Sequence, residues 1–181
     1  MNSSEKKVPP ITVEEYYRIT EQYEERTELL NGEIIAMASQ SIRHQRISGR
    51  LFSLVDSFIT GNGGSCTPLQ AVDVELNNEN VVVPDFLVLC APDKMDELRC
   101  YGAPDWIVEI MSTNRNNDLI TKLWLYRNAG VREYWIVDPK NEKTLVYFFD
   151  KSEFPNIYTF DTPIPVGIFD ERLAVRIADL L

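Results

Sequence analysis

Histidine is almost absent from this chain of 181 residues, which contains one, His44. That count excludes any site built on two histidines, and it leaves a single centre for a Ser-His-Asp arrangement. Cysteine is also scarce: there are three, at positions 66, 90 and 100, with no CxxC spacing. An odd count without that spacing argues against a disulfide framework and against a thiolate zinc site. The expected absence of a disulfide framework and of a thiolate zinc site fits a protein of the reducing cytoplasm.

Long apolar runs are missing as well. No run approaches the roughly 18 residues that a membrane-spanning helix needs. The first ten residues, MNSSEKKVPP, have no hydrophobic stretch behind their lysines, so they do not read as a signal peptide. We expect residues 1–11 to form a disordered lead and residues 12–181 to form a single domain, the natural prior for this length.

Positive charge is in deficit: the net charge is −10 and the sequence pI is near 4.6. Such a balance counts against non-specific nucleic-acid binding, which needs a basic surface. A local basic face on an acidic protein is still compatible with it. The best candidates are Arg43, Arg46 and Arg50, on the polar side of a predicted helix at 41–60. A solvated helix face explains these arginines at least as well.

The segments that are present predict a mixed sheet. Thr12 followed by Glu15 predicts a capping box opening a helix at 12–25, and Asn31-Gly32 predicts a hairpin turn between strands at 26–30 and 33–38. The further expected elements are helices at 41–60 and 114–129 and strands at 66–76, 81–90, 105–111 and 133–138, followed by a hairpin of TLVYFF with NIYTF and a last amphipathic segment.

The order from residue 41 is therefore helix, three strands, helix, strand (αβββαβ). Three strands joined by short turns should be mostly antiparallel, and the helical crossover at 114–129 should return a parallel strand. We predict an α/β fold: a mixed β-sheet flanked by helices. Pro84 interrupts the run VVVPDFLVL, which indicates a bulge or a change of pairing partner.

Two predicted strands each enclose a carboxylate between apolar residues. Asp85 lies in VVVPDFLVL and Glu109 lies in PDWIVEIM. A charge buried in a strand is costly unless it is paired or binds a metal. Mg²⁺ takes one or two carboxylates together with water and substrate phosphate, and Lys122 could orient that phosphate or the attacking water. These residue types predict a divalent-metal site for phosphodiester hydrolysis.

The same residues also fit ordinary structural roles. Asp118 and Lys122 have the spacing of a common helix ion pair. Asp85 could cap a bulge, and Glu109 could pair with an arginine. Glu28 flanks the predicted hairpin turn, as Glu33 does, and we expect both to be exposed to solvent.

Several strings then show a resemblance to a known family. RTELLNGEI, RHQRISGRLF, VVVPDFLVL, GAPDWIVEIMS and TKLWLYRNAGVREYWIVDP resemble the bacterial Uma family of restriction endonucleases, long classed as a domain of unknown function, over residues 12–178. The resemblance implies the restriction-endonuclease-like fold of the PD-(D/E)XK superfamily, whose core order is αβββαβ. It also implies that Pro84-Asp85 is the "PD" pair and that Glu109 is the next carboxylate.

The same resemblance assigns further residues. Met111 stands where the superfamily has a lysine, which implies that Lys122 takes its place from the following helix. Glu28, within the family's E-L-x-x-G-E string, is implied as a further acidic contributor. His44-Gln45 matches another family string of unknown role. The loop at 112–115 reads STNR where the family has Ser-Pro-Ser-Thr, a departure that touches the implied site.

The implied function is a Mg²⁺- or Mn²⁺-dependent endonuclease that acts on DNA as a homodimer. We expect activity to fall as the pH drops without needing His44, which should cap or pack its helix. We also expect alanine at position 122 to spare folding and abolish cleavage. A different class of protein, a non-catalytic accessory or interaction protein on a nuclease scaffold, also suits the acidic charge and the missing strand lysine. A nuclease acting on RNA or single strands is a third, weaker alternative.

Overall fold

The computed structural model describes residues 9–112 and 116–181, without the side chains of residues 116–118. A six-stranded mixed sheet forms its centre. The strands, in spatial order, are β11 (Asn156–Thr159), β10 (Lys143–Phe148), β9 (Glu133–Asp138), β8 (Trp106–Ile110), β6 (Phe86–Leu89) and β3 (Thr67–Leu69). Strand β6 runs antiparallel to both β3 and β8, β8 and β9 are parallel, and β10 runs antiparallel to both β9 and β11.

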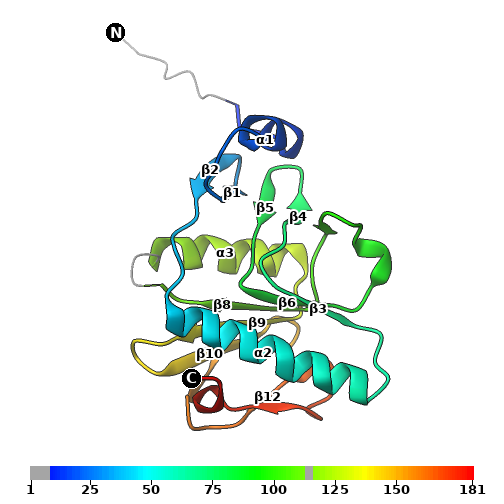
Figure 1. Cartoon of the computed structure of the whole chain (residues 1–181), viewed down its shortest axis with the longest axis vertical. Helices are drawn as coiled ribbons and strands as arrows, with labels where there is room; N and C mark the ends of the chain where they lie inside the picture. Colours follow the sequence, from blue (N-terminus) through cyan, green and yellow to red (C-terminus); the bar gives the residue numbers. More distant parts are fainter. Residues whose placement is uncertain (1–8, 113–115) are drawn as a thin grey trace.

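Helices α2 (Ile42–Gly61) and α3 (Asn116–Ala129) cover opposite faces of this sheet (Figure 1). The alternation of side chains along β6 shows why. Phe86 and Val88 pack with α2 in one core cluster, whereas Leu87 and Leu89 pack with α3 in another. Because successive side chains of a strand point to opposite faces, a fully apolar strand must be covered on both.

The predicted core order is confirmed: α2, then β3, β6 and β8, then α3, then β9. The crossover through α3 brings β9 back parallel to β8, with Glu109 opposite Ile136. Both helix ends follow the glycine signals, since α2 ends at Gly61 and Gly130, with φ of 94°, follows α3. The α/β fold is thus the predicted one.

The strands predicted at 66–76 and 81–90 were wrong in one respect, because each is divided between two sheets. A second sheet has the order β2–β1–β5–β4–β7. Its strands are β2 (Glu33–Ala36), β1 (Thr27–Leu30), β5 (Asn80–Val82), β4 (Val74–Asn77) and β7 (Cys100–Tyr101). The chain leaves the first sheet near Ala71, whose φ is 49°, and returns at Pro84. The Ala71 N–H donates to the Pro84 carbonyl at 3.1 Å, so the two breaks lie side by side.

Figure 1 shows the second sheet above α3, which therefore lies between the two sheets. Side chains from both sheets meet α3 in one core cluster that contains Leu30, Val82, Ile107 and Tyr126. The proline signal at position 84 is explained by this architecture, since it marks the point where one continuous apolar run changes from one sheet to the other.

The expectation about cysteines was wrong. Cys66 and Cys90 form a disulfide, and Cys100 is free and buried. The antiparallel pairing of β3 with β6 sets Thr67 opposite Leu89, which brings the two flanking cysteines together across 24 residues of sequence. Spacing along the chain could not show this pairing. The cytoplasmic location stays a prediction and no longer has the cysteines as support.

The N-terminal helix α1 (Val13–Thr20) has the predicted capping box of Thr12 with Glu15, although it is shorter than the predicted 12–25. Of the predicted disordered lead, residues 1–8 lie outside the described part of the chain. Ile11 is ordered, because its N–H donates to the Gly32 carbonyl at 3.0 Å. No helix among the described residues is both long and apolar enough to cross a membrane.

The C-terminal segment contains β12 (Ile164–Pro165), β13 (Ala174–Val175) and short 3₁₀ turns, of which one spans Gly167–Phe169. A buried carboxylate, Glu133 on β9, attaches it to the main sheet. Its Oε2 accepts the Ile168 N–H at 2.9 Å, and its Oε1 accepts the Trp135 indole N–H at 2.7 Å. Burial raises the pKa of Glu133 to about 7, against the effect of these donors.

This carboxylate should make stability depend on pH. The native pKa lies above the ordinary 4.5, so the contribution is fully present below pH 4.5 and is lost as the pH rises through about 7. The free energy of unfolding should therefore fall over this window by up to about 3 kcal/mol because of Glu133. Urea unfolding from pH 4.5 to 8 should show that Glu133→Gln lacks this part of the slope, while exposed Glu153→Gln keeps it. Parallel curves for both variants would contradict the assignment.

Candidate active site

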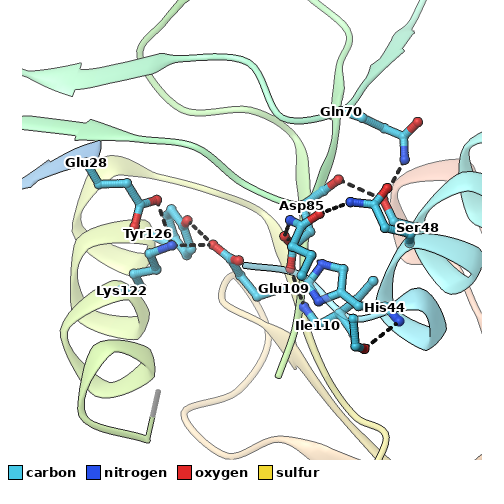
Figure 2. A network of polar contacts seen from close by, with 12 residues as sticks. Glu28, His44, Ser48, Gln70, Asp85, Glu109, Ile110, Lys122 and Tyr126 are labelled. Carbon is cyan, nitrogen blue, oxygen red and sulfur yellow. Dashed lines mark hydrogen bonds and ion pairs between the residues drawn. The ribbon is translucent and has the colours of Figure 1, made fainter. Parts of the chain in front are cut away.

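Asp85 lies where the chain returns to the main sheet, and three elements hold it there (Figure 2). Its Oδ2 accepts the Ile110 N–H of β8 at 2.7 Å, and its Oδ1 accepts the Gln40 amide at 2.8 Å. The Ser48 hydroxyl of α2 donates to the Asp85 backbone carbonyl at 3.0 Å. These contacts fix Asp85 between the first turns of α2 and the end of β8.

His44, in the first turn of α2, also faces Asp85. Its Nε2 lies 2.9 Å from Asp85 Oδ1 without meeting hydrogen-bond geometry, and its Nδ1 is buried with no partner among the described residues. The backbone N–H of His44 donates to Ser41, the N-cap of the helix. The expectation that His44 only caps or packs its helix was therefore incomplete, because the ring contacts a predicted site residue.

Glu109 and Lys122 form the second half of the site. The Lys122 amine donates to Glu109 Oε1 at 3.0 Å and to Glu28 Oε1 at 2.7 Å. The Tyr126 hydroxyl donates to the same Glu109 oxygen at 2.7 Å. Lys122 and Tyr126 are four residues apart on α3, so they share one face of the helix. The placement expected for Lys122, toward the carboxylates, is confirmed, while its part in catalysis stays a prediction.

Glu28 is fully buried, so the expectation that it is exposed was wrong. It lies on β1, inside the second sheet, and its Oε1 accepts both the Val83 N–H at 2.7 Å and the Lys122 amine. Its Oε2 is buried without a hydrogen-bond partner in the described part of the chain. Glu28 is therefore linked to the site through Lys122 and is not among the residues that line the cavity, and its implied part as an acidic contributor stays a prediction.

The electrostatics of the site are dominated by negative charge. The pKa of Glu109 is raised to about 7: burial is the largest cause, the charges of Asp85 and Glu28 add to it, and Lys122 and the Tyr126 hydroxyl oppose it. The carboxylates of Glu28, Asp85 and Glu109 are thus buried in one region, and the Lys122 amine is buried with them. A surplus of negative charge of this kind is relieved by protonation or by a bound cation.

One small cavity brings the predicted catalytic residues together. Asp85, Glu109 and Lys122 line it, together with His44 and Gln40. Among the described residues no group of three His, Cys, Asp or Glu side chains is arranged to hold a metal on its own. Two carboxylates on a cavity wall with surplus negative charge nevertheless fit Mg²⁺, which keeps several water ligands.

The three arginines predicted to contact DNA are all engaged by their own chain. Arg43 donates to the Pro139 carbonyl at 2.8 Å and pairs with Glu142 at 3.1 Å. Arg46, at 2.8 Å, and Arg50 both donate to the Leu181 carbonyl. All three contacts are solvent-exposed, so a polyanion could compete for the guanidinium groups. A role in DNA contact stays a prediction.

Two predictions depend on residues or side chains that the structure does not describe. These are the helix pair of Asp118 with Lys122 and the altered loop, of which residues 113–115 are not described. Sequence reasoning missed two residues of the site, Gln40 and Tyr126. The helical spacing of Tyr126 from Lys122 was the available signal, because an aromatic four residues after a buried lysine reaches the same partner.

Comparisons with known proteins identify the family of this chain. The sequence model of the Uma2 family, described as "Putative restriction endonuclease", matches residues 13–164. Two uncharacterized proteins of Synechocystis sp. are similar. One, slr1290, is 29% identical over 145 residues, covering 77% of this chain and 74% of that protein. The other, sll1609, is 28% identical over 135 residues, covering 71% and 75% respectively.

A solved structure has the same fold. It is the crystal structure of "a putative nuclease belonging to DUF820" from Anabaena variabilis ATCC 29413. The two structures agree with a TM-score of 0.78 at 23% sequence identity, over 94% of this chain and 97% of the other. At that identity the likeness confirms the architecture, and the chemistry has to be argued from the residues.

Proposed function

Because this chain belongs to the Uma2 family of "putative restriction endonuclease" proteins, we propose that it is a nuclease that hydrolyses DNA phosphodiester bonds with the help of Mg²⁺ or Mn²⁺. One observation carries the proposal: Asp85, directly before β6, and Glu109, on the neighbouring strand β8, line a single cavity with Lys122. Ordinary structural roles do not require two carboxylates and a lysine to converge on one cavity.

Each residue of the site would have a distinct role. Asp85 and Glu109 would hold the divalent cation, which when bound supplies Lewis-acid stabilisation of charge on the phosphate and its attacking water. Gln40 and the Ile110 N–H hold Asp85 in place. Lys122 opposes the rise in the pKa of Glu109 and would supply positive charge at the cavity wall, where a substrate phosphate would approach.

The state of assembly and the substrate belong to the same proposal. One chain carries one such cavity among its described residues, so cutting both strands of a duplex would use two copies, as a homodimer supplies. The net charge of −10 requires the DNA contact to be local. The arginines of α2 are the candidates for this contact. Their guanidinium groups would release the backbone carbonyls that they now bind and donate to DNA phosphates instead.

Cleavage of a supercoiled plasmid tests the proposal. Wild-type protein should nick or linearise the plasmid with Mg²⁺ or Mn²⁺ and stop when a chelator is added. Asp85→Asn should lower the rate at least about 100-fold, since losing a metal ligand removes several kcal/mol of transition-state stabilisation. Asp56→Asn, on the exposed side of α2, should cleave normally.

Absence of metal-dependent cleavage by the wild type on duplex, single-stranded and RNA substrates would reject the proposal. If the protein cleaved only RNA or single strands, the proposed substrate would change, and the assignment of the site residues would still hold. Binding to a protein partner without any cleavage would favour the accessory role on a nuclease scaffold.

A further inference from the structure

The hydroxyl of Tyr126 has a single acceptor in the site. It donates to Glu109 Oε1 at 2.7 Å, and the Lys122 amine donates to that same oxygen at 3.0 Å. No protein group among the described residues donates to Glu109 Oε2. Glu109 also lines the cavity that contains Asp85. Within the described part of the chain, two donors therefore occupy one oxygen of the carboxylate and leave the other available to a ligand in the cavity.

Packing holds the donor in position. Tyr126 is fully buried, and its ring meets the ring of Tyr134 edge to face, with centroids 5.0 Å apart. It lies between the two sheets in the core cluster on the α3 side. Close packing around the ring restricts its movement, so the hydroxyl stays where Glu109 can accept its hydrogen bond. A phenol also keeps its proton at neutral pH, which makes it a permanent donor.

We infer that Tyr126 is a positioning residue, which together with Lys122 fixes one oxygen of Glu109 and thereby turns the other oxygen toward the cation site. The inference rests on the proposed function, because it needs Glu109 to be a metal ligand. Partners of this kind orient ligating carboxylates, and their loss typically weakens metal affinity by about 10–100-fold.

Calorimetric titration with Mn²⁺ tests this inference without measuring activity. Tyr126→Phe keeps the ring and removes the hydroxyl, and it should raise the Kd for Mn²⁺ by about 10-fold or more. Tyr147→Phe is the matched control. Tyr147 is a nearly buried tyrosine of the same aromatic cluster, with its ring centroid 6.1 Å from that of Tyr134, and its loss should leave the Kd unchanged.

Urea unfolding of each variant separates positioning from general stability. A purely structural role predicts that Tyr126→Phe loses stability while its Mn²⁺ affinity stays at the wild-type value, and that result would overturn the inference alone. An equal loss of affinity in Tyr147→Phe would also overturn it, since the effect would then belong to the aromatic cluster. Wild-type protein that binds no Mn²⁺ would instead reject both this inference and the proposed cation site.

Discussion

Lys122→Ala should lower the free energy of unfolding at pH 8 by about 3–5 kcal/mol, the cost of breaking a buried ion pair by removing one partner. Lys122 is 2% exposed and donates to Glu28 and Glu109, which are 0% and 6% exposed. Without the amine, two buried carboxylates lose their compensating charge. The sequence led us to expect that alanine would spare folding, and the burial of Glu28 is the reason to revise that expectation.

Urea unfolding measures this loss, with exposed Lys140→Ala as the control that should change little. The loss should shrink toward pH 5. Glu109, whose pKa is raised to about 7, is then protonated and neutral, so it no longer needs the positive charge of the amine. Adding Glu28→Gln and Glu109→Gln to Lys122→Met should restore much of the stability, since a neutral trio carries no uncompensated charge. A loss below about 1 kcal/mol for Lys122→Ala would show that the pairs contribute as weakly as surface ones.

Glu109→Gln should have the opposite profile: cleavage falls at least about 100-fold while stability at pH 8 is kept or raised. An amide oxygen still accepts the Lys122 and Tyr126 donors, and Lys122 retains Glu28 at 2.7 Å. The pKa of Glu109 is raised above 4.5 to about 7, so the native state disfavours the ionised carboxylate. Its contribution to stability is therefore lost as the pH rises through 7, and a neutral side chain avoids that loss.

The pair of measurements is plasmid cleavage with Mg²⁺ and urea unfolding at pH 5 and pH 8. Exposed Glu142→Gln should leave both quantities near the wild-type values, apart from its surface pair with Arg43. If Glu109→Gln retained full cleavage, Glu109 would not be a metal ligand. If it lost activity and stability together, its carboxylate would be a structural group whose loss damages the fold.

Local patterns in the sequence were enough to specify the core of this protein. Continuous apolar runs around Asp85 and Glu109 predicted buried strands, and the helical spacing at 41–60 and 114–129 predicted the helices that cover them. Each of these patterns depends on the period of one element, so it can be read without knowing its neighbours. Because a crossover helix returns a parallel strand, the order of the elements also predicted the mixed sheet.

Pairing between distant segments could be learned from the three-dimensional arrangement alone. Glu28 and Lys122 are 94 residues apart, and Cys66 and Cys90 are 24 apart. Nothing in the hairpin around Asn31 shows that the second sheet will cover α3 and bury Glu28 against it. The polar side of α2 likewise does not show that its arginines will meet carbonyl groups near residues 139 and 181. Such contacts depend on how whole elements pack, and burial then decides which carboxylates lose water, change pKa and can hold a cation.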